Sequence, residues 1–302
     1  MRLQKIKNFL HKDSVFITLM LLPAVLMVLL FTYYPLFKGA TMAFQNYNLF
    51  NLSATKWVGL DNFRTLFSHD PANTFYAAIW NTVKWVFVSL FFQFTIGFLI
   101  AMLLRKSFFA SSIYKGIIAF PWAVSGFMIG VIWRWIFNGS SGVLNDLLLR
   151  IGIITEPVGW LSETSLALNS VIIANIWYGI PFFVIMISAA LNSVPVSLYE
   201  AADIDGANGF QKFFRITLPQ TSRTLALSLL LRIIWIFNFP DLIYSMTDGG
   251  PGGSSEIITS YMITKVQSLD FGMASAIGLV IIAILGIYVI LYVWLTGRGD
   301  EV

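Results

Sequence analysis

The sequence contains no cysteine among its 302 residues, and its only histidines are His11 and His69. Without cysteine the chain forms neither a disulfide nor a thiolate metal site. The two histidines lie far apart in polar stretches, so we predict no metal site. Charged residues make up only 11% of the chain, whereas soluble domains carry about 25%. This scarcity of charge excludes an ordinary soluble domain.

A phosphate-binding loop is also missing. The motif G-x-x-x-x-G-K-[ST] does not occur, and the glycine-rich segment 249–255 lacks the lysine that would hold phosphates. A membrane enzyme would need a cluster of acid, base or metal-binding groups within its apolar segments. Those segments hold few ionisable side chains besides Arg232 and Asp241. We therefore predict no catalytic residue and no cofactor in this chain, so any energy from ATP must come through a partner.

Hydrophobic residues are abundant instead. They make up 57% of the sequence, and the mean hydropathy is +0.77. A bilayer-spanning helix needs about 20 consecutive apolar residues. Six segments fit this requirement: 15–37, 85–104, 113–137, 166–191, 224–246 and 271–296. The sequence thus predicts an all-α integral membrane protein with six transmembrane helices in a single domain, residues 1–302.

The distribution of basic residues predicts the orientation. Six spans place both termini on one side, and lysine-rich and arginine-rich loops remain in the cytoplasm. With the N-terminus inside, the inner segments hold eleven basic residues and the longer outer segments hold five. The inner set is Arg2, Lys5, Lys7, Lys12, Arg105, Lys106, Lys115, Lys212, Arg215, Arg223 and Arg298, and the outer set is Lys38, Lys56, Arg64, Arg150 and Lys265. We therefore predict cytoplasmic termini and a cytoplasmic loop at 199–220.

Three further basic residues lie in or beside the spans. Lys84 and Arg134 are within a few residues of the predicted outer ends, where long side chains reach the headgroups. Arg232 lies about 13 Å from the inner end of the fifth span. An arginine at such depth costs roughly 2.5–3.5 kcal/mol on insertion scales. It therefore needs a carboxylate partner or a watery cavity, and the sequence leaves open a pathway-lining role and an ion pair with a partner subunit.

Two helical faces combine aromatic rings with polar groups at spacings of three and four residues. The sets are Asn175, Tyr178, Gly179 and Phe182 on the fourth span, and Arg232, Trp235, Asn238 and Phe239 on the fifth. Rings that stack on a sugar and donors that bind its hydroxyls are typical of sugar sites. Ordinary packing between membrane helices produces the same pattern, so spacing alone leaves both interpretations open.

The segment 199–220, YEAADIDGANGFQKFFRITLPQ, is a polar stretch between two apolar ones. Acidic residues come first and basic residues follow, as at helix starts and ends, and Gly206 permits a turn. We therefore predict a short helix, a turn and a second short helix. On the second helix Phe210, Phe213 and Phe214 are expected to share one face. That face either lies on lipid as an interfacial helix or docks on another protein.

A motif in this segment favours the docking interpretation. Its members are Glu200-Ala201-Ala202, Gly206, Ile216 and Leu218-Pro219, and their spacing resembles the EAA loop of the permease subunits of bacterial ABC importers. The form Asp205-Gly206-Ala207 resembles the carbohydrate branch of that family. The stretches GLDNFRTLF, NIWYGIPF, FQKFFRITLP and FNFPDLIYSMTDGGP are similar to maltose-type sugar permeases. One departure is Arg223, which stands where many sugar permeases have a second proline.

The resemblance implies a compact six-span permease with the type I ABC importer architecture in a bacterial inner or plasma membrane. It implies inward transport, by alternating access, of a sugar or oligosaccharide, or of a glycerol-phosphate-type compound. The implied partners are a second homologous permease, two cytoplasmic ATPase subunits that carry ATP and Mg, an extracytoplasmic solute-binding protein and membrane lipid, but no nucleic acid. An importer for amino acids or phosphonates, which use related loops, is the alternative.

The resemblance also assigns roles to residues. It implies that the sugar is contacted by the residues of the two aromatic and polar faces other than Asn238, namely Asn175, Tyr178, Gly179, Phe182, Arg232, Trp235 and Phe239. The residues implied in coupling to the ATPase are Glu200, Ala201, Ala202, Asp203, Asp205, Gly206, Ala207, Phe210, Phe213 and Phe214.

Overall fold

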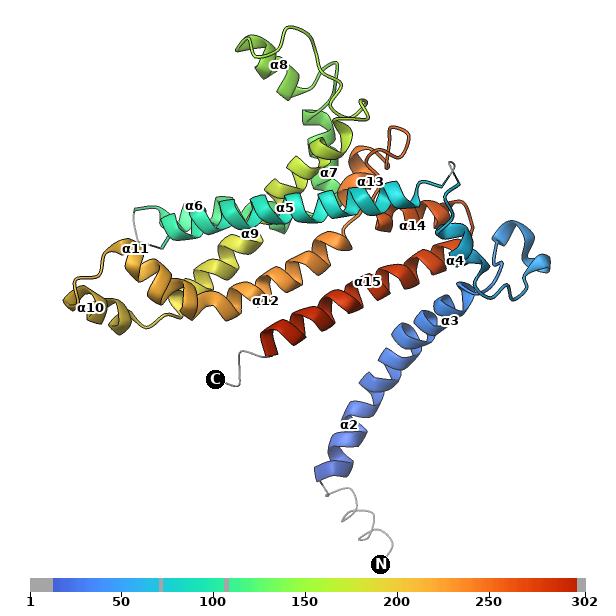
Figure 1. The fold of residues 1–302 in the computed structure, drawn as a ribbon, viewed down its shortest axis with the longest axis horizontal. Helices are drawn as coiled ribbons and strands as arrows, with labels where there is room; N and C mark the ends of the chain where they lie inside the picture. The colour runs from blue at the N-terminus through green and yellow to red at the C-terminus, as the bar shows by residue number, and fades with distance from the viewer. Residues whose placement is uncertain (1–12, 71–72, 106–108, 298–302) are drawn as a thin grey trace, which may run out of the picture. The chain divides into compact units, whose positions relative to one another are not determined.

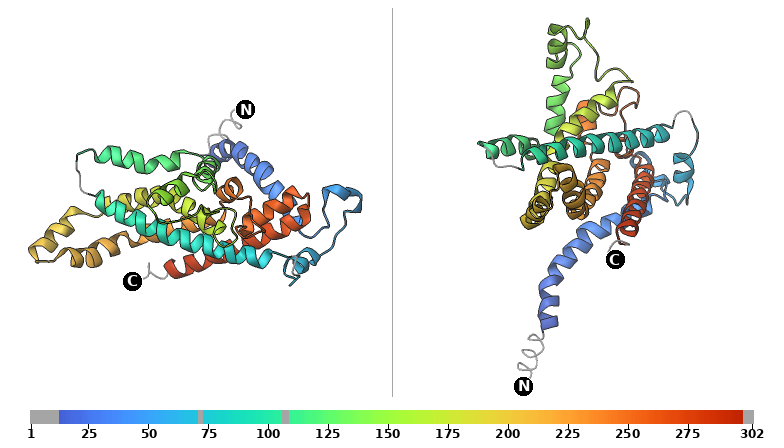
Figure 2. Two further views of the ribbon diagram at one scale, coloured as in Figure 1. Left: turned by 90° about the horizontal axis from the view of Figure 1, so that it is seen from above. Right: turned by 60° about the vertical axis from the view of Figure 1, so that its left-hand side comes forward.

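The computed structural model describes residues 13–70, 73–105 and 109–297. Within these ranges the regular structure is helical, apart from two isolated β-bridges. The chain divides into two compact units, residues 1–68 with 265–280, and residues 69–264 with 281–302. Figures 1 and 2 show the helices from three directions. The observed helical content confirms the all-α prediction.

The first unit begins with a long helical segment made of α2 (Asp13–Val28), the π-helix η1 (Leu29–Tyr33) and α3 (Tyr34–Met42). It covers the predicted first span, 15–37, and extends beyond it. None of the apolar window at 16–42 is buried within the chain. A helix that is apolar on all sides and unburied requires lipid or another protein as its surroundings.

Short elements follow in the same unit, namely the 3₁₀-helix η2 (Leu49–Ala54) and α4 (Asp61–Leu66). The Asn62 side-chain amide donates to the carbonyls of Ala43 and Gln45 at 2.8 and 2.9 Å. The backbone N–H of Gly272 donates to the Tyr47 carbonyl at 2.9 Å. A side chain at Gly272 would lie 2.5 Å from the Gln45 carbonyl oxygen, so this close backbone approach requires glycine.

The second unit holds most of the remaining helices, and Figure 1 labels its α-helices. In chain order they are α5 (Phe75–Leu103), α6 (Ser111–Ala119), η3 (Phe120–Ala123), α7 (Gly126–Ile136), α8 (Val143–Arg150), α9 (Ala167–Asn192), α10 (Val196–Ile204), α11 (Gly209–Lys212), η4 (Phe213–Thr217), α12 (Leu218–Phe237) and α13 (Asp241–Met246). Two helices have residues in both units, α14 (Ile258–Gln267) and α15 (Phe271–Gly297).

The core of the second unit lies among α5, α9 and α12, which pack on one another. Buried residues from all three helices form one cluster: Ala101, Phe182, Phe183, Ile187, Leu191 and Leu225. Gly97 lets α5 approach α9 closely, since a methyl group there would lie 2.6 Å from the Phe183 Cβ atom. Small residues at such crossings are how membrane helices gain packing contacts.

Two predicted spans are not single helices. The third, 113–137, consists of α6, η3 and α7, and the chain bends by 98° between 123 and 126. Pro121 lies in η3 and has no N–H to continue a helix. The fifth, 224–246, is also divided, because α12 ends at Phe237 and α13 begins at Asp241.

Within the described residues, four helices are long and apolar enough to cross a membrane: 16–42, 75–103, 167–192 and 271–296. The bent pair α6–η3 with α7 makes a fifth if it is one span. The helix α12 does not meet the same test; its sequence carries Arg223 and Arg232. The structure therefore shows a protein with several membrane-spanning helices, and the count of six remains a prediction.

Candidate functional site

A cavity of about 380 Å³ lies among η3, α9 and the C-terminal end of α12. Its lining residues are Trp122, Tyr178, Arg232, Trp235, Ile236, Asn238 and Phe239. Five of these belong to the two sequence-predicted faces, so the fold brings the fourth and fifth spans together around one space. We call this space the arginine cavity.

Arg232 is held by a chain of buried amides. Its Nε atom donates to Gln93 Oε1 at 2.7 Å, and Gln93 Nε2 donates to the Asn175 carbonyl at 2.8 Å. The side-chain amide of Asn175 in turn donates to Ser89 Oγ at 2.9 Å. All four residues are buried, and Arg232 is only 4% exposed. The network crosses α5, α9 and α12 and fixes the arginine at one position.

Among the described residues, the guanidinium of Arg232 has aromatic and amide neighbours and forms no ion pair. Its Cζ atom lies 5.6 Å from the centre of the Phe182 ring, a cation–π contact. Among the described residues the ion pairs are Arg64–Asp61, Arg150–Asp146 and Lys212–Asp203. Within this part of the chain, Gln93 is thus the hydrogen-bond partner of Arg232 and nothing cancels its charge.

Gly179 makes room for this network. A methyl group at Gly179 would collide with the Gln93 side chain and with one terminal nitrogen of Arg232. Its importance is steric, because it lies within the continuous helix α9. Gly179 therefore lets the arginine and glutamine lie against the α9 backbone.

Aromatic rings form much of the cavity wall. Tyr178 and Phe239 stack with their centres 5.2 Å apart and their planes 3° from parallel. Trp235 contacts Phe182 at 5.4 Å and Trp122 at 6.1 Å between ring centres, yet it remains 46% exposed. This wall offers flat apolar surface beside a charged donor group, a combination that suits a sugar ring.

Besides Gly179, two residues of the predicted faces support the cavity without lining it. Asn175 is fully buried behind Gln93, and Phe182 is 3% exposed and packs in the core of the unit. Sequence reasoning missed Gln93 and Trp122. Gln93 could have been found, because a lone glutamine in the apolar segment 85–104 needs a buried partner. Trp122 gave no such signal, since its position depends on the bend after Pro121.

A second candidate region is the coupling loop, residues 199–220. Its first helix, α10, ends at Ile204, and Gly206 follows with φ of +71°. The backbone N–H of Ala207 donates to the Ala202 carbonyl at 2.8 Å and closes the turn. This left-handed position is one that glycine adopts readily, as expected from the sequence. A side chain at Gly206 would meet nothing within 4 Å, so the turn lies open.

The second half of the coupling loop corrects two expectations. Asn208 and Gln211 cap α11 reciprocally, but α11 continues through the π-helix η4 into α12 instead of ending as a separate short helix. Pro219 is accommodated in the first turn of α12, directly after the π-helical turn. The predicted shared face was also wrong in part, because Phe213 turns inward to contact Phe98 at 5.8 Å between ring centres.

Side-chain contacts fix the coupling loop to the ends of the long helices. The Arg105 guanidinium lies 4.5 Å from the centre of the Tyr199 ring, and the Tyr199 hydroxyl hydrogen-bonds Thr217 Oγ1 at 2.8 Å. Lys212 and Asp203 form an ion pair across the turn. In Figures 1 and 2 the loop projects beyond the ends of α9 and α12. The coupling loop is therefore an ordered unit held by side-chain contacts.

Apolar side chains nevertheless stand exposed on this loop. Ile204 is 88% exposed, Phe210 72% and Phe214 48%. The rings of Phe210 and Phe214 contact each other at 4.4 Å between centres. The acidic residues Glu200 and Asp205 are exposed as well. An exposed apolar patch beside charged groups marks a surface that another molecule covers.

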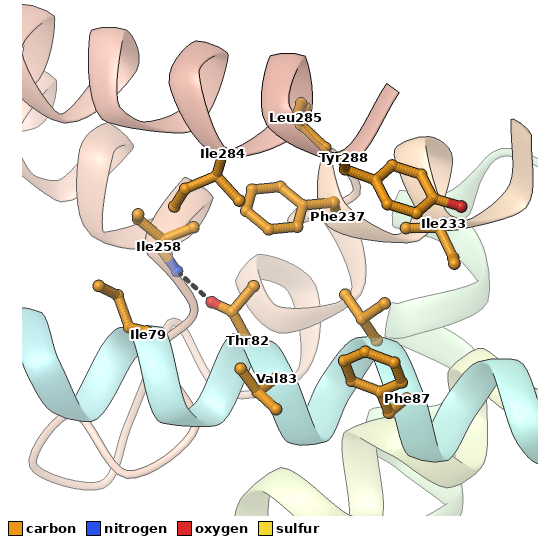
Figure 3. A pocket seen from close by; sticks show the side chains of 11 residues that line it. Ile79, Thr82, Val83, Phe87, Ile233, Phe237, Ile258, Ile284, Leu285 and Tyr288 are labelled. Atoms are coloured by element: carbon orange, nitrogen blue, oxygen red, sulfur yellow. Dashed lines mark hydrogen bonds between the residues drawn. The ribbon is translucent and has the colours of Figure 1, made fainter. Parts of the chain in front are cut away.

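A further cavity in the second unit, of about 240 Å³, differs from the arginine cavity in its chemistry. Figure 3 shows its lining by side chains of α5, α12 and α15 together with Ile258. The Thr82 hydroxyl on its wall accepts a hydrogen bond from the Ile258 N–H at 2.9 Å. The remaining wall is largely aliphatic and aromatic, so this space offers a sugar few polar partners.

Comparison with known proteins identifies the family. Residues 93–298 match the family described as the inner membrane component of binding-protein-dependent transport systems. The match covers both the arginine cavity and the coupling loop. The chain therefore belongs to the family of ABC transporter permease subunits, as the motif at 199–220 predicted.

Individual relatives include sugar permeases. The sulfoquinovosyl glycerol permease SmoG of Agrobacterium fabrum is 32% identical, over 90% of this chain and 87% of its own. The trehalose/maltose permease MalF of Thermococcus litoralis is 31% identical, over 91% of each. A chain from a crystal structure of a bacterial ABC transporter involved in the import of the acidic polysaccharide alginate is 27% identical. Its TM-score is 0.83, with 97% of this chain and 99% of that chain covered.

Proposed function

We propose that this chain is one of two homologous permease subunits of an ABC importer that carries a sugar or oligosaccharide into a bacterial cell. It crosses the inner or plasma membrane six times, with both termini and the coupling loop in the cytoplasm. The remaining partners are two ATPase subunits, which hold ATP and Mg, and an extracytoplasmic solute-binding protein. The relatives' names and the basic bias of the inner segments support this assignment.

The observation that carries the proposal is one unbroken helical segment, residues 209–237, formed by α11, η4 and α12. Its first turn holds the exposed Phe210 of the coupling loop, and its last turns hold Arg232 and Trp235 of the arginine cavity. Phe214 is the second exposed ring of the coupling loop. At 1.5 Å per residue, it lies about 27 Å from Arg232 along the helix axis. A displacement of the docked loop therefore moves one wall of the cavity.

This linkage supplies a mechanism for alternating access. Closure of the ATPase pair on ATP displaces the coupling loop, and the helix transmits the movement to the cavity wall. The sugar stacks on Trp235 and on the Tyr178–Phe239 pair while the cavity faces outward. It loses these contacts when α9 and α12 separate toward the cytoplasm.

The binding-protein partner has support from a solved neighbour. The alginate transporter was also crystallised in complex with an alginate pentasaccharide-bound periplasmic protein, and its chain there matches with a TM-score of 0.83 and 27% identity. A glycerol-phosphate-type substrate is a second candidate, because the same arginine would bind a phosphate bidentately. Aromatic walls favour the sugar.

Reconstitution tests the proposal. The chain, a second permease and the ATPase are placed in liposomes with the binding protein outside, and radiolabelled sugars are offered. We expect the sugar to accumulate inside the liposomes, and only when ATP is enclosed in the lumen, which the ATPase faces. Accumulation of amino acids or phosphonates, with no sugar taken up, would contradict the sugar assignment while leaving the importer assignment intact.

A further inference from the structure

The starting point is a positive charge that the described chain leaves uncompensated. Arg232 is 4% exposed, and burying an unpaired ion is strongly unfavourable. Its described polar partner is Gln93, which is neutral. The cost of burying the charge therefore has to be met by something outside the described residues.

The orientation of Gln93 is fixed by chemistry. Its Nε2 atom donates to a backbone carbonyl, that of Asn175, and only the nitrogen end of the amide can donate. The oxygen end must then face Arg232 Nε. Gln93 thus holds the guanidinium by one edge and leaves both terminal nitrogens, Nη1 and Nη2, without a hydrogen-bond partner in the described chain.

Those terminal nitrogens are the pair that a guanidinium uses for end-on binding of an oxyanion. Arg232 lines the cavity, and the other lining residues carry no acidic group. A hydroxyl of a neutral sugar would accept one hydrogen bond there but would bring no charge. A carboxylate would accept two hydrogen bonds and neutralise the cation.

We infer that the transported sugar is acidic and that Arg232 binds its anionic group inside the membrane. This inference rests on the proposed function and narrows it to a substrate class, sugars bearing a carboxylate or another oxyanion. Gln93 acts as a positioning residue, because it aims the terminal nitrogens into the cavity. The aromatic wall binds the apolar faces of the rings and contributes no charge preference.

The experiment measures uptake of matched sugar pairs by the complete transporter with its own binding protein. The probes are mono-, di- and trisaccharides of galacturonic acid and the same sugars with each carboxyl group reduced to a primary alcohol. We expect the parental transporter to accumulate an acidic member. In Arg232→Gln its uptake should fall at least tenfold, and Arg232→Lys should retain a measurable part.

A second variant acts without removing the arginine. Gln93→Glu keeps the side-chain shape and supplies a permanent internal counter-charge, so uptake of the acidic probe should again fall at least tenfold. The matched control is Arg64→Gln, which removes a basic side chain that is 78% exposed and paired with Asp61. Its uptake should stay within twofold of the parental rate.

Three other outcomes are decisive. Uptake of a neutral sugar that Arg232→Gln leaves unchanged would overturn the inference and keep the proposed function. Loss of the second permease from purified Arg232→Gln would show that a partner carboxylate supplies the counter-charge, which overturns the inference too. No uptake of any probe, together with no uptake of the radiolabelled sugars offered in the reconstitution, would contradict the proposed sugar function itself.

Discussion

The arginine cavity buries a charged side chain, whereas the coupling loop exposes apolar side chains. In the cavity a cation lies buried, with Arg232 held by neutral Gln93. On the loop apolar side chains lie exposed, among them Ile204 and Phe210. Each arrangement is unfavourable in the isolated chain, by the cost of burying charge in one case and of wetting apolar surface in the other. Each imbalance agrees with the partner proposed for its region, an anionic sugar in the cavity and the ATPase on the coupling loop.

The difference extends to how each region tolerates change. The amide network behind the cavity is tightly packed, so a methyl group added at Gly179 meets both Gln93 and Arg232. The coupling loop is open at its turn, where a side chain at Gly206 would meet nothing within 4 Å. Substitutions in that network should affect folding and transport together, whereas substitutions on the loop or at the exposed cavity wall should affect transport alone.

The largest effect is expected for Gly206→Asp. Aspartate tolerates the left-handed conformation better than most residues, so the strain is about 1 kcal/mol and the spans should remain folded. The new side chain projects from the docking surface, and sugar uptake should be abolished while the permease still inserts into the membrane. The measurement is ATP-driven uptake together with the amount of ATPase that copurifies.

Gly152→Asp is the matched control for this substitution. Gly152 also has a positive φ, of +72°, with nothing within 4 Å of a side chain, but it lies after α8, away from the coupling loop. Its strain is the same, so uptake should persist. Equal loss in both variants would assign the effect to backbone strain and not to docking.

Gly179→Ala should have the second-largest effect. The methyl group collides with Gln93 and Arg232, and overpacking of this kind costs roughly 1–3 kcal/mol. We expect at least tenfold slower uptake and a lower thermal denaturation temperature of the purified complex. Gly116→Ala on α6, where a methyl group meets nothing within 4 Å, should leave both quantities unchanged. If Gly179→Ala also changed neither, the side chains of Gln93 and Arg232 would have to move aside at little cost.

Trp235→Ala should give a smaller loss, confined to transport. Its ring is 46% exposed and lines the cavity, so its removal takes away stacking surface without opening the core. Uptake measured over a range of sugar concentrations should be several-fold weaker, with normal subunit composition. Trp135→Ala, at a ring that is 69% exposed on α7, is the comparison. Parental uptake by Trp235→Ala would remove this ring from the sugar path.

Glu200→Ala is expected to have the smallest effect. Glu200 is exposed on α10, and one exposed charged contact is worth about 0.3–1 kcal/mol. Uptake should fall about two- to fivefold with the ATPase still bound. A loss as complete as that of Gly206→Asp would show that docking depends on this charge more than on the turn.

Much of this contrast could be predicted from the sequence. Helical spacing placed Arg232 and Trp235 on one face of the fifth span, because that spacing is a local property of the chain. The positive φ at Gly206 followed from the same kind of local reasoning. The predicted depth of Arg232 in the membrane identified it as a functional candidate, since burying its charge is unfavourable whichever helices pack around it.

The remainder depended on contacts between distant segments. Gln93 meets Arg232 only after α5 packs on α12, and the inward turn of Phe213 depends on the π-helical turn of η4. The end of α12 at Phe237 was missed because the apolar pattern continues through Pro240 into α13. Such features arise from tertiary packing, which periodicity along one segment does not report.

Site-specific cross-linking tests the central claim, that the coupling loop docks on the ATPase in the cytoplasm. The chain has no cysteine, so Ile204→Cys and Ile153→Cys each introduce one thiol, at side chains that are 88% and 67% exposed. We predict that a short thiol-to-amine cross-linker joins Ile204→Cys to the ATPase, and that a membrane-impermeant reagent added outside labels Ile153→Cys alone. Labelling of Ile204→Cys from outside, with no cross-link to the ATPase, would contradict the account.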